Sequence, residues 1–109
     1  MGHLYLLTKQ TERVVPTLEK ALNFEPVHPS AYNLLAYHYA QEGQQLANAV
    51  QLVNKALQKK PGCYYYLDTK GLVLLKMGKR KASRTFLKQA LRKAPHDKVI
   101  KEHLRQATQ

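Results

Sequence analysis

The chain has 109 residues, enough for one small domain, and 18 Lys and Arg against 7 Asp and Glu give a formal net charge of +11. It contains no run of about 18 apolar residues, which excludes a transmembrane helix, and the apolar stretch at residues 4–7 is too short for a signal peptide. A single cysteine, Cys63, excludes an internal disulfide and a cysteine-rich metal site, so we expect a cytoplasmic protein.

We expect an all-α chain whose helices lie at residues 2–9, 12–24, 30–42, 46–59, 63–77, 80–93 and 97–107. Pro16 lies in the first turn of the second helix and Pro29 opens the third, positions where proline is tolerated. Gly43 and Gly78 can adopt the left-handed conformation that ends a helix. Asp97 is a good N-cap for the last helix.

A short phrase recurs three times, as KALNFEP at 20–26, KALQKKP at 55–61 and QALRKAP at 89–95. Its prolines, Pro26, Pro61 and Pro95, are spaced 35 and then 34 residues apart. A fixed period in this range indicates an array of helical repeats. The prolines fall just past the second helix of each pair, where that helix must stop.

The residues before each proline sharpen this pattern, with small side chains where paired helices approach and large ones beside them. The small ones are Ala36, Gly71, Ala49, Ser83, Ala56 and Ala90, and the large ones are Tyr32, Leu35, Tyr39, Val53, Leu67, Leu74 and Leu87. This arrangement resembles the tetratricopeptide repeat (TPR). Lys70 replaces the Leu usual in the family, Ser83 replaces an Ala, and one extra residue stands near Gln45–Leu46. The phrase LDTKG at 67–71 looks most like bacterial members.

The resemblance implies a right-handed α-solenoid of helix-turn-helix pairs. We expect one domain over 1–109, with a truncated repeat at 1–26, whole repeats at 27–61 and 62–95, and a capping helix at 96–109. Arg105 stands where a fourth repeat needs a small residue, which favours a cap with Ile100 and Leu104 on its apolar face. The incomplete first repeat suggests either a piece of a longer array or self-association there.

In TPR arrays the first helices of each pair line a concave groove, and the resemblance implies a protein-binding scaffold that holds a peptide or helix there. The groove positions are Asn33, Leu34, Tyr37, Ala40, Gln41, Tyr65, Asp68, Thr69, Leu72 and Lys76, and Val99, Glu102 and His103 are candidates to continue the wall. A plain solvent face is the alternative for each position. Asp68 argues against the carboxylate clamp found in some members, because it would repel a carboxylate.

Charge is uneven along the chain, with a net −1 over residues 1–54 and +12 over residues 55–109. The basic surface consists of Lys79, Arg80, Lys81, Arg84, Lys88 and Arg92, expected on the convex side. Its alternatives are a solvated face, a site for an acidic protein surface, or a nucleic-acid site. Nucleic acid is disfavoured because only Phe86 is interleaved with the basic residues.

Catalytic chemistry is not indicated. The five histidines lack metal-ligand spacing with one another, and no glycine-rich phosphate loop is present. Nothing in the sequence orients Cys63 and a histidine as a nucleophile pair. We therefore expect no enzyme activity, no metal and no cofactor.

Overall fold

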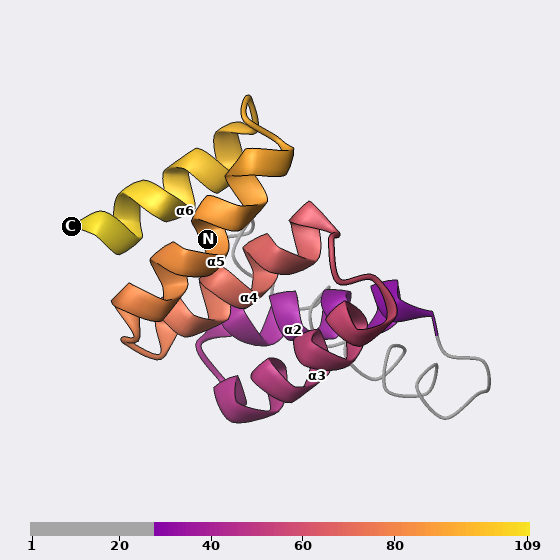
Figure 1. Ribbon diagram of the computed structural model, residues 1–109. Coiled ribbons are helices and arrows are strands. Elements are labelled where there is room, and N and C mark those ends of the chain that lie inside the picture. The colour runs from indigo at the N-terminus through magenta and orange to yellow at the C-terminus, as the bar shows by residue number, and fades with distance from the viewer. Residues whose placement is uncertain (1–27) are drawn as a thin grey trace, which may run out of the picture.

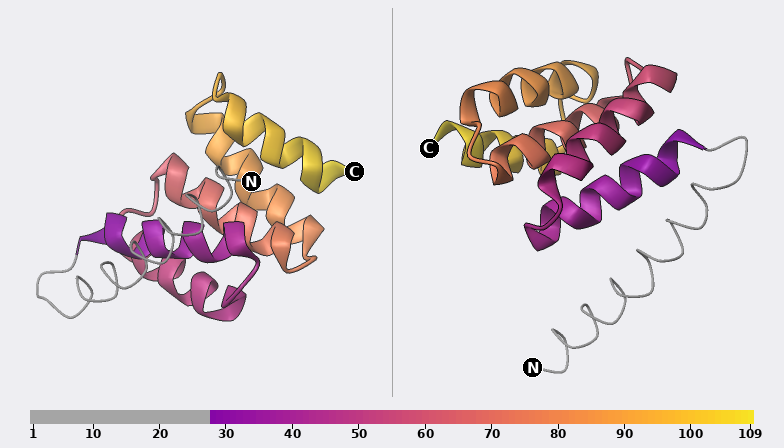
Figure 2. Two further views of the ribbon diagram at one scale, coloured as in Figure 1. Left: turned by 180° about the vertical axis from the view of Figure 1, so that it is seen from behind. Right: turned by 90° about the horizontal axis from the view of Figure 1, so that it is seen from below.

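The computed structural model describes residues 28–109, and within that range the chain is all-α, with five helices and no strand (Figures 1 and 2). The helices are α2 (Pro29–Glu42), α3 (Leu46–Lys59), α4 (Tyr64–Lys76), α5 (Arg80–Lys93) and α6 (Lys98–Thr108). Each bound lies within one residue of the expected position. The expected helices at 2–9 and 12–24, and with them the truncated repeat and the self-association surface, lie outside the described residues.

The helix ends follow from local backbone chemistry. Gly43 ends α2 with φ 68°, and its N–H donates to the Ala40 carbonyl at 3.2 Å. Gly78 follows α4 with φ 82°. Both glycines lie in the left-handed region that a residue without Cβ enters most cheaply, as expected. Asp97 Oδ1 accepts the Ile100 N–H at 3.0 Å, so Asp97 is the N-cap of α6.

The extra residue of the second repeat lies between α2 and α3. Helix α3 begins three residues after Gly43, whereas α5 begins two residues after Gly78. The turn accommodates the insertion by placing Gln45 at φ 52°, the one left-handed non-glycine residue among those described. Asn48 Nδ2 donates to Gln45 Oε1 at 2.7 Å, which ties this turn to the first turn of α3.

The helices pack as neighbouring pairs. Helix α2 packs on α3 and α4 packs on α5, while α4 also contacts α2 and α3, and α6 packs on α5 and α4 (Figure 1). One buried cluster joins the first three helices through Ala36, Ala49, Val53, Leu72 and Val73, together with Ala40. A second cluster of Leu67, Ala90 and Ile100 joins the last three. Helix α4 contributes to both clusters, so it packs on the helices before it and after it in the chain.

Two of the small residues, Gly71 and Ser83, meet where α4 and α5 cross. A Cβ added at Gly71 would lie 2.5 Å from both Cγ and Cδ2 of Leu87. Ser83 is fully buried and its Oγ donates to the Gly71 carbonyl at 2.7 Å, so the hydroxyl that replaces the usual Ala methyl has a partner. This contact holds α4 and α5 close together.

Helix α6 packs on α5 and α4, and its side chains Ile100 and Ala107 are 1% and 0% exposed. Leu104, expected on the same apolar face, is only half-buried. Arg105 is exposed and its guanidinium pairs with Glu102 on the same helix. Arg105 and Glu102 thus lie on an exposed side of α6, and the capping role of α6 stays a prediction.

Candidate partner-binding groove

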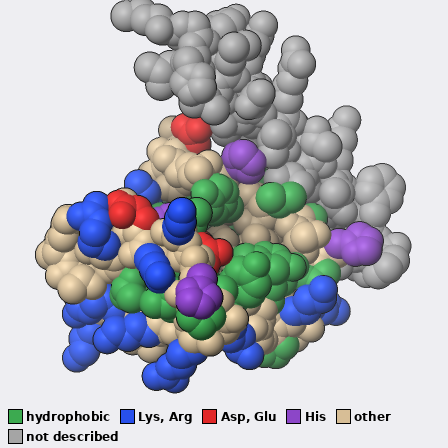
Figure 3. Space-filling view, turned by 90° about the horizontal axis from the view of Figure 1, so that it is seen from above, with side chains coloured by type: hydrophobic (Ala, Val, Ile, Leu, Met, Phe, Trp, Pro, Cys, Tyr) green, Lys and Arg blue, Asp and Glu red, His purple; other side chains and the backbone are tan. Residues whose placement is uncertain are grey.

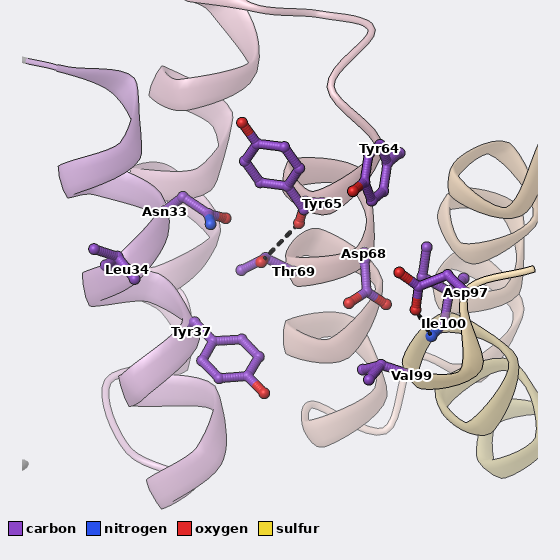
Figure 4. A pocket seen from close by; sticks show the side chains of 10 residues that line it. All are labelled: Asn33, Leu34, Tyr37, Tyr64, Tyr65, Asp68, Thr69, Asp97, Val99 and Ile100. Carbon is purple, nitrogen blue, oxygen red and sulfur yellow. Dashed lines mark hydrogen bonds between the residues drawn. The ribbon is translucent and has the colours of Figure 1, made fainter. Parts of the chain in front are cut away.

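A pocket of about 330 Å³ opens between α2, α4 and the start of α6 (Figure 4). Ten residues line it: Asn33, Leu34, Tyr37, Tyr64, Tyr65, Asp68, Thr69, Asp97, Val99 and Ile100. Helices α2, α4 and α6, which alternate along the chain with α3 and α5, thus contribute side chains to one hollow. We call this hollow the groove pocket.

Helix α2 supplies one wall, made by three residues close together in the sequence. Leu34 is 47% exposed and Tyr37 is half-buried, so both present apolar surface to an incoming group. Asn33 is only 9% exposed, and its Oδ1 is buried with no hydrogen-bond partner among the described residues. An unpaired buried amide oxygen is costly, which marks Asn33 as an acceptor available to a ligand.

Helix α4 supplies the floor. Thr69 Oγ1 donates to the Tyr65 carbonyl at 2.9 Å, which fixes the hydroxyl against its own helix. Asp68 is 7% exposed, and its Oδ1 lies 2.8 Å from Nδ1 of His103 on α6. Burial of the carboxylate is tolerated because this partner is present.

The three consecutive tyrosines divide between the core and the pocket. Tyr66 is 1% exposed, while Tyr64 and Tyr65 line the pocket and meet edge-to-face with ring centroids 5.2 Å apart. Hydrogen bonding with the Cys63 side chain raises the pKa of Tyr65 above its usual value of 10. The Tyr65 hydroxyl therefore stays protonated at neutral pH.

Helix α6 closes the far side through Asp97, Val99 and Ile100. Val99 is 53% exposed and extends the apolar rim. One carboxylate oxygen of Asp97 accepts the hydrogen bond that caps the helix, and Asp97 also forms part of the pocket wall (Figure 4). Electrostatically the pocket contains two carboxylates, and no Lys or Arg is among the residues that line it.

The structure brings together six of the expected groove residues and the wall residue Val99. The six are Asn33, Leu34, Tyr37, Tyr65, Asp68 and Thr69. Gln41 and Lys76 are exposed but lie outside the pocket. Two expectations need correction: Leu72 is 4% exposed and Ala40 0% exposed, and both lie in the core cluster of α2, α3 and α4. Their side chains are covered because α2 and α4 pack directly on each other.

Sequence reasoning missed Tyr64, Asp97 and Ile100 as pocket residues, and it missed the pairing of Asp68 with His103. His103, expected on the wall, instead lies against Asp68, and Glu102 pairs with Arg105 outside the pocket. No periodicity in the sequence signals this pairing, because the contact of His103 with Asp68 depends on how α6 packs against α4.

The basic surface is only partly free. Lys79, Lys81, Lys88 and Arg92 are exposed, as expected of a solvent-facing stripe. Arg84, however, is half-buried and its Nη1 donates to the Ala107 carbonyl at 2.9 Å, and Arg80 donates to the Gln109 carbonyl. These two guanidinium groups bind the carbonyl end of α6, where a cation is favourable. Arg80 is nevertheless exposed, whereas Arg84 is less accessible than expected.

Hydrophobic and basic side chains are distributed unevenly over the face of the molecule that Figure 3 shows. Figure 3 shows hydrophobic side chains gathered in the middle of one face, with Lys and Arg mostly along its lower and left parts.

Among residues 28–109 no helix is long and apolar enough to cross a membrane. No group of three His, Cys, Asp or Glu side chains in that range could hold a metal ion.

Residues 36–107 match the sequence profile of a family described as "Psidin, N-terminal TPR repeats region". The match covers more than half of the chain, and the chain therefore belongs to this family of TPR regions. TPR repeats generally mediate protein–protein interactions, and their fold is not a catalytic one. No curated protein matches the chain. The expected likeness to bacterial members stays a prediction.

Proposed function

We propose that the chain is a non-catalytic scaffold that binds a partner polypeptide in the groove pocket. The observation that carries this proposal is the pocket itself, which combines exposed apolar side chains at its rim with an unpaired buried acceptor in its wall. Leu34 and Val99 supply the rim and Asn33 Oδ1 the acceptor. Recognition sites for peptides commonly pair apolar contacts with a few fixed polar groups, which give specificity.

The first test is capture from a cell lysate with and without nuclease, using the parent chain and a Leu34→Ala/Tyr65→Ala variant. Both side chains are nearly half exposed, so their truncation should leave the fold intact. We expect a protein partner that survives nuclease and is lost with the variant. Retention of the same partner by the variant would remove the groove pocket from consideration.

Leu72 is unsuitable for this test, although its spacing places it among the expected groove positions. It is 4% exposed and belongs to the core, so Leu72→Ala should cost about 2–5 kcal/mol of stability. Loss of binding in that variant would report unfolding rather than a lost contact.

A second candidate function uses the basic surface to bind an acidic protein or nucleic acid. The observation in its favour is that Lys79 and Lys81 line one surface hollow, and Lys88 and Arg92 another. A Lys88→Glu/Arg92→Glu variant tests it, because both residues are exposed and neither donates to α6. Nucleic-acid binding would also weaken steeply with salt, with a log–log slope set by the number of phosphates contacted. A partner in the groove pocket should tolerate this charge reversal.

A further inference from the structure

The groove pocket has the opposite charge to the rest of the chain. Residues 28–109 contain only four acidic side chains, Glu42, Asp68, Asp97 and Glu102, and two of these four line the pocket. None of the many Lys and Arg side chains in the same range lines it. The groove pocket therefore carries acidic and no basic side chains, although the domain as a whole has a large excess of positive charge.

The carboxylates are also incompletely used by the protein. Asp68 Oδ1 is paired with His103 Nδ1, and Asp97 Oδ1 accepts the Ile100 N–H. Each carboxylate has a second oxygen, which accepts no hydrogen bond from a described residue. A carboxylate has about four lone-pair sites, so each of these groups has capacity for a further donor.

A third acceptor, independent of the carboxylates, lies in the same wall. Asn33 is about nine-tenths buried, and its Oδ1 has no partner among the described residues. The amide projects from α2 towards α4 across the pocket (Figure 4). A buried oxygen without a donor calls for a ligand that brings one.

The remaining walls suit an aliphatic stem that ends in a cation. Leu34 and Val99 offer apolar surface, and the rings of Tyr37, Tyr64 and Tyr65 line the pocket around the acceptors. Tyrosine faces attract ammonium and guanidinium groups, and this attraction is stronger where water is excluded. Lysine and arginine side chains carry only donors at their heads and long apolar stems, so they match both features.

We infer that the groove pocket binds a lysine or arginine side chain of the partner polypeptide. This inference rests on the proposed function and specifies the partner's chemistry. The head group lies between Asp68 and Asp97 and donates to their free oxygens, and the stem packs on Leu34 and Val99. The partner is therefore a basic segment at this point, in contrast to the acidic partner that the net charge of the chain suggests.

The test is an NMR titration of the ¹⁵N-labelled full chain with two blocked heptapeptides, Ala-Ala-Leu-Lys-Leu-Ala-Ala and the same peptide with norleucine for lysine. Norleucine keeps the stem and removes the ammonium. We expect the lysine peptide to shift the amide signals of Asp68, Thr69 and Val99, and the norleucine peptide to bind roughly tenfold more weakly, the effect of one charge-assisted hydrogen bond.

A matched pair of variants assigns the effect to the pocket. Asp97→Asn removes a charge from the wall but keeps the N-cap, because Asn caps a helix as well as Asp. Glu102→Gln makes the same charge change on α6 outside the pocket. We expect Asp97→Asn to weaken the lysine peptide several-fold and Glu102→Gln to leave it unchanged.

Two outcomes would overturn the inference, and they bear differently on the proposed function. Equal binding of both peptides, with shifts in the pocket, would leave the groove as a peptide site but remove the cation. The cation site would also be refuted if the lysine peptide shifted only amide signals of residues outside the pocket, or shifted no signals at all. The capture experiment with Leu34→Ala/Tyr65→Ala would then decide separately whether the groove binds a partner.

Discussion

The Asp68 carboxylate and the His103 imidazole lie 2.8 Å apart, Oδ1 to Nδ1, and join α4 to α6 beside the groove pocket. Their side chains are 10% and 12% exposed, whereas the ion pair of Glu102 with Arg105 is about half exposed. Interactions between charged or polar groups are stronger where water is excluded. The contact therefore both satisfies a buried acid and positions the last helix against the groove.

A double-mutant cycle measures this contact. We expect Asp68→Ala and His103→Ala to destabilise the fold, with a coupling free energy of about 1–2 kcal/mol in urea denaturation, because either single change leaves the other group without its partner. The corresponding cycle on the exposed Glu102 and Arg105 should show much weaker coupling. Independent, additive effects of Asp68→Ala and His103→Ala would contradict the buried pairing.

The crossing of α4 and α5 at Gly71 predicts strong sensitivity to added volume. Gly71→Leu should destabilise the fold by about 3 kcal/mol or more, because even a Cβ at this position would meet Leu87 at 2.5 Å. Gly62→Ala is the matched control, since its Cβ would meet only the flexible end of Lys93, at 3.2 Å. Thermal melting of Gly71→Leu within a degree or two of the parent would show that the helix register is wrong.

Lys70 stands where the repeat usually has Leu, and a neutral side chain should be more stable there. Its ammonium lies 4.4 Å from the Phe86 ring centroid, and burial lowers the pKa of Lys70 below its usual 10.5. We expect Lys70→Met to raise stability by about 0.5 kcal/mol, a small gain because the side chain is partly solvated and the cation–π contact is lost. Lys76→Met, at an exposed site, should change little.

The difference in stability between the parent and Lys70→Met depends on pH, and its direction follows from the lowered pKa of Lys70. The folded protein binds the Lys70 proton less tightly than the unfolded chain does. At neutral pH, where Lys70 is charged in both states, the full free-energy cost of burying that charge therefore lowers the stability of the parent. That cost fades as the pH rises through the lowered pKa towards 10.5. Urea denaturation at neutral and alkaline pH should therefore show the gap between parent and Lys70→Met closing, and a gap that widens would contradict the burial of this charge.

Glu102 provides a prediction at acid pH. Hydrogen bonds from Arg105, and secondarily from Gln106, lower the pKa of Glu102 to about 2 from its usual 4.5. The contribution of this carboxylate to stability is therefore present above pH 4.5 and lost as the pH falls towards 2. An NMR titration should show the Glu102 pKa rising in Arg105→Gln and in concentrated salt, because the pair is exposed and salt screens it. A pKa near 4.5 in the parent would refute the interaction.

The five helices of residues 28–109 could be predicted from the sequence almost to the residue, because their signals are local and repeat. The period fixes Gly71, Ser83 and Ala90 at helix crossings, and Gly43 and Gly78 can end helices where other residues are strained. The family resemblance, confirmed by the match over 36–107, supplied the pairing of helices. The division into repeats and the handedness of the array stay predictions.

The groove was predicted less completely, because exposure depends on how neighbouring helices cover one another. Leu72 has the spacing of a groove residue but lies under α2 in the core. The position of His103 against Asp68 depends on the angle at which α6 packs, which no periodicity encodes. Arg84 likewise fits a basic stripe on its own helix and meets the end of α6 only in three dimensions.

Photo-crosslinking tests the groove pocket as the partner site most directly, with benzoylphenylalanine placed in turn at Tyr65, in the groove pocket, and at Lys88, on the basic surface. Both positions are exposed and can accept the substitution. We predict that position 65 forms a covalent adduct with the partner polypeptide and that position 88 does not. Adducts at 88 alone would contradict a groove site and place the partner on the basic surface.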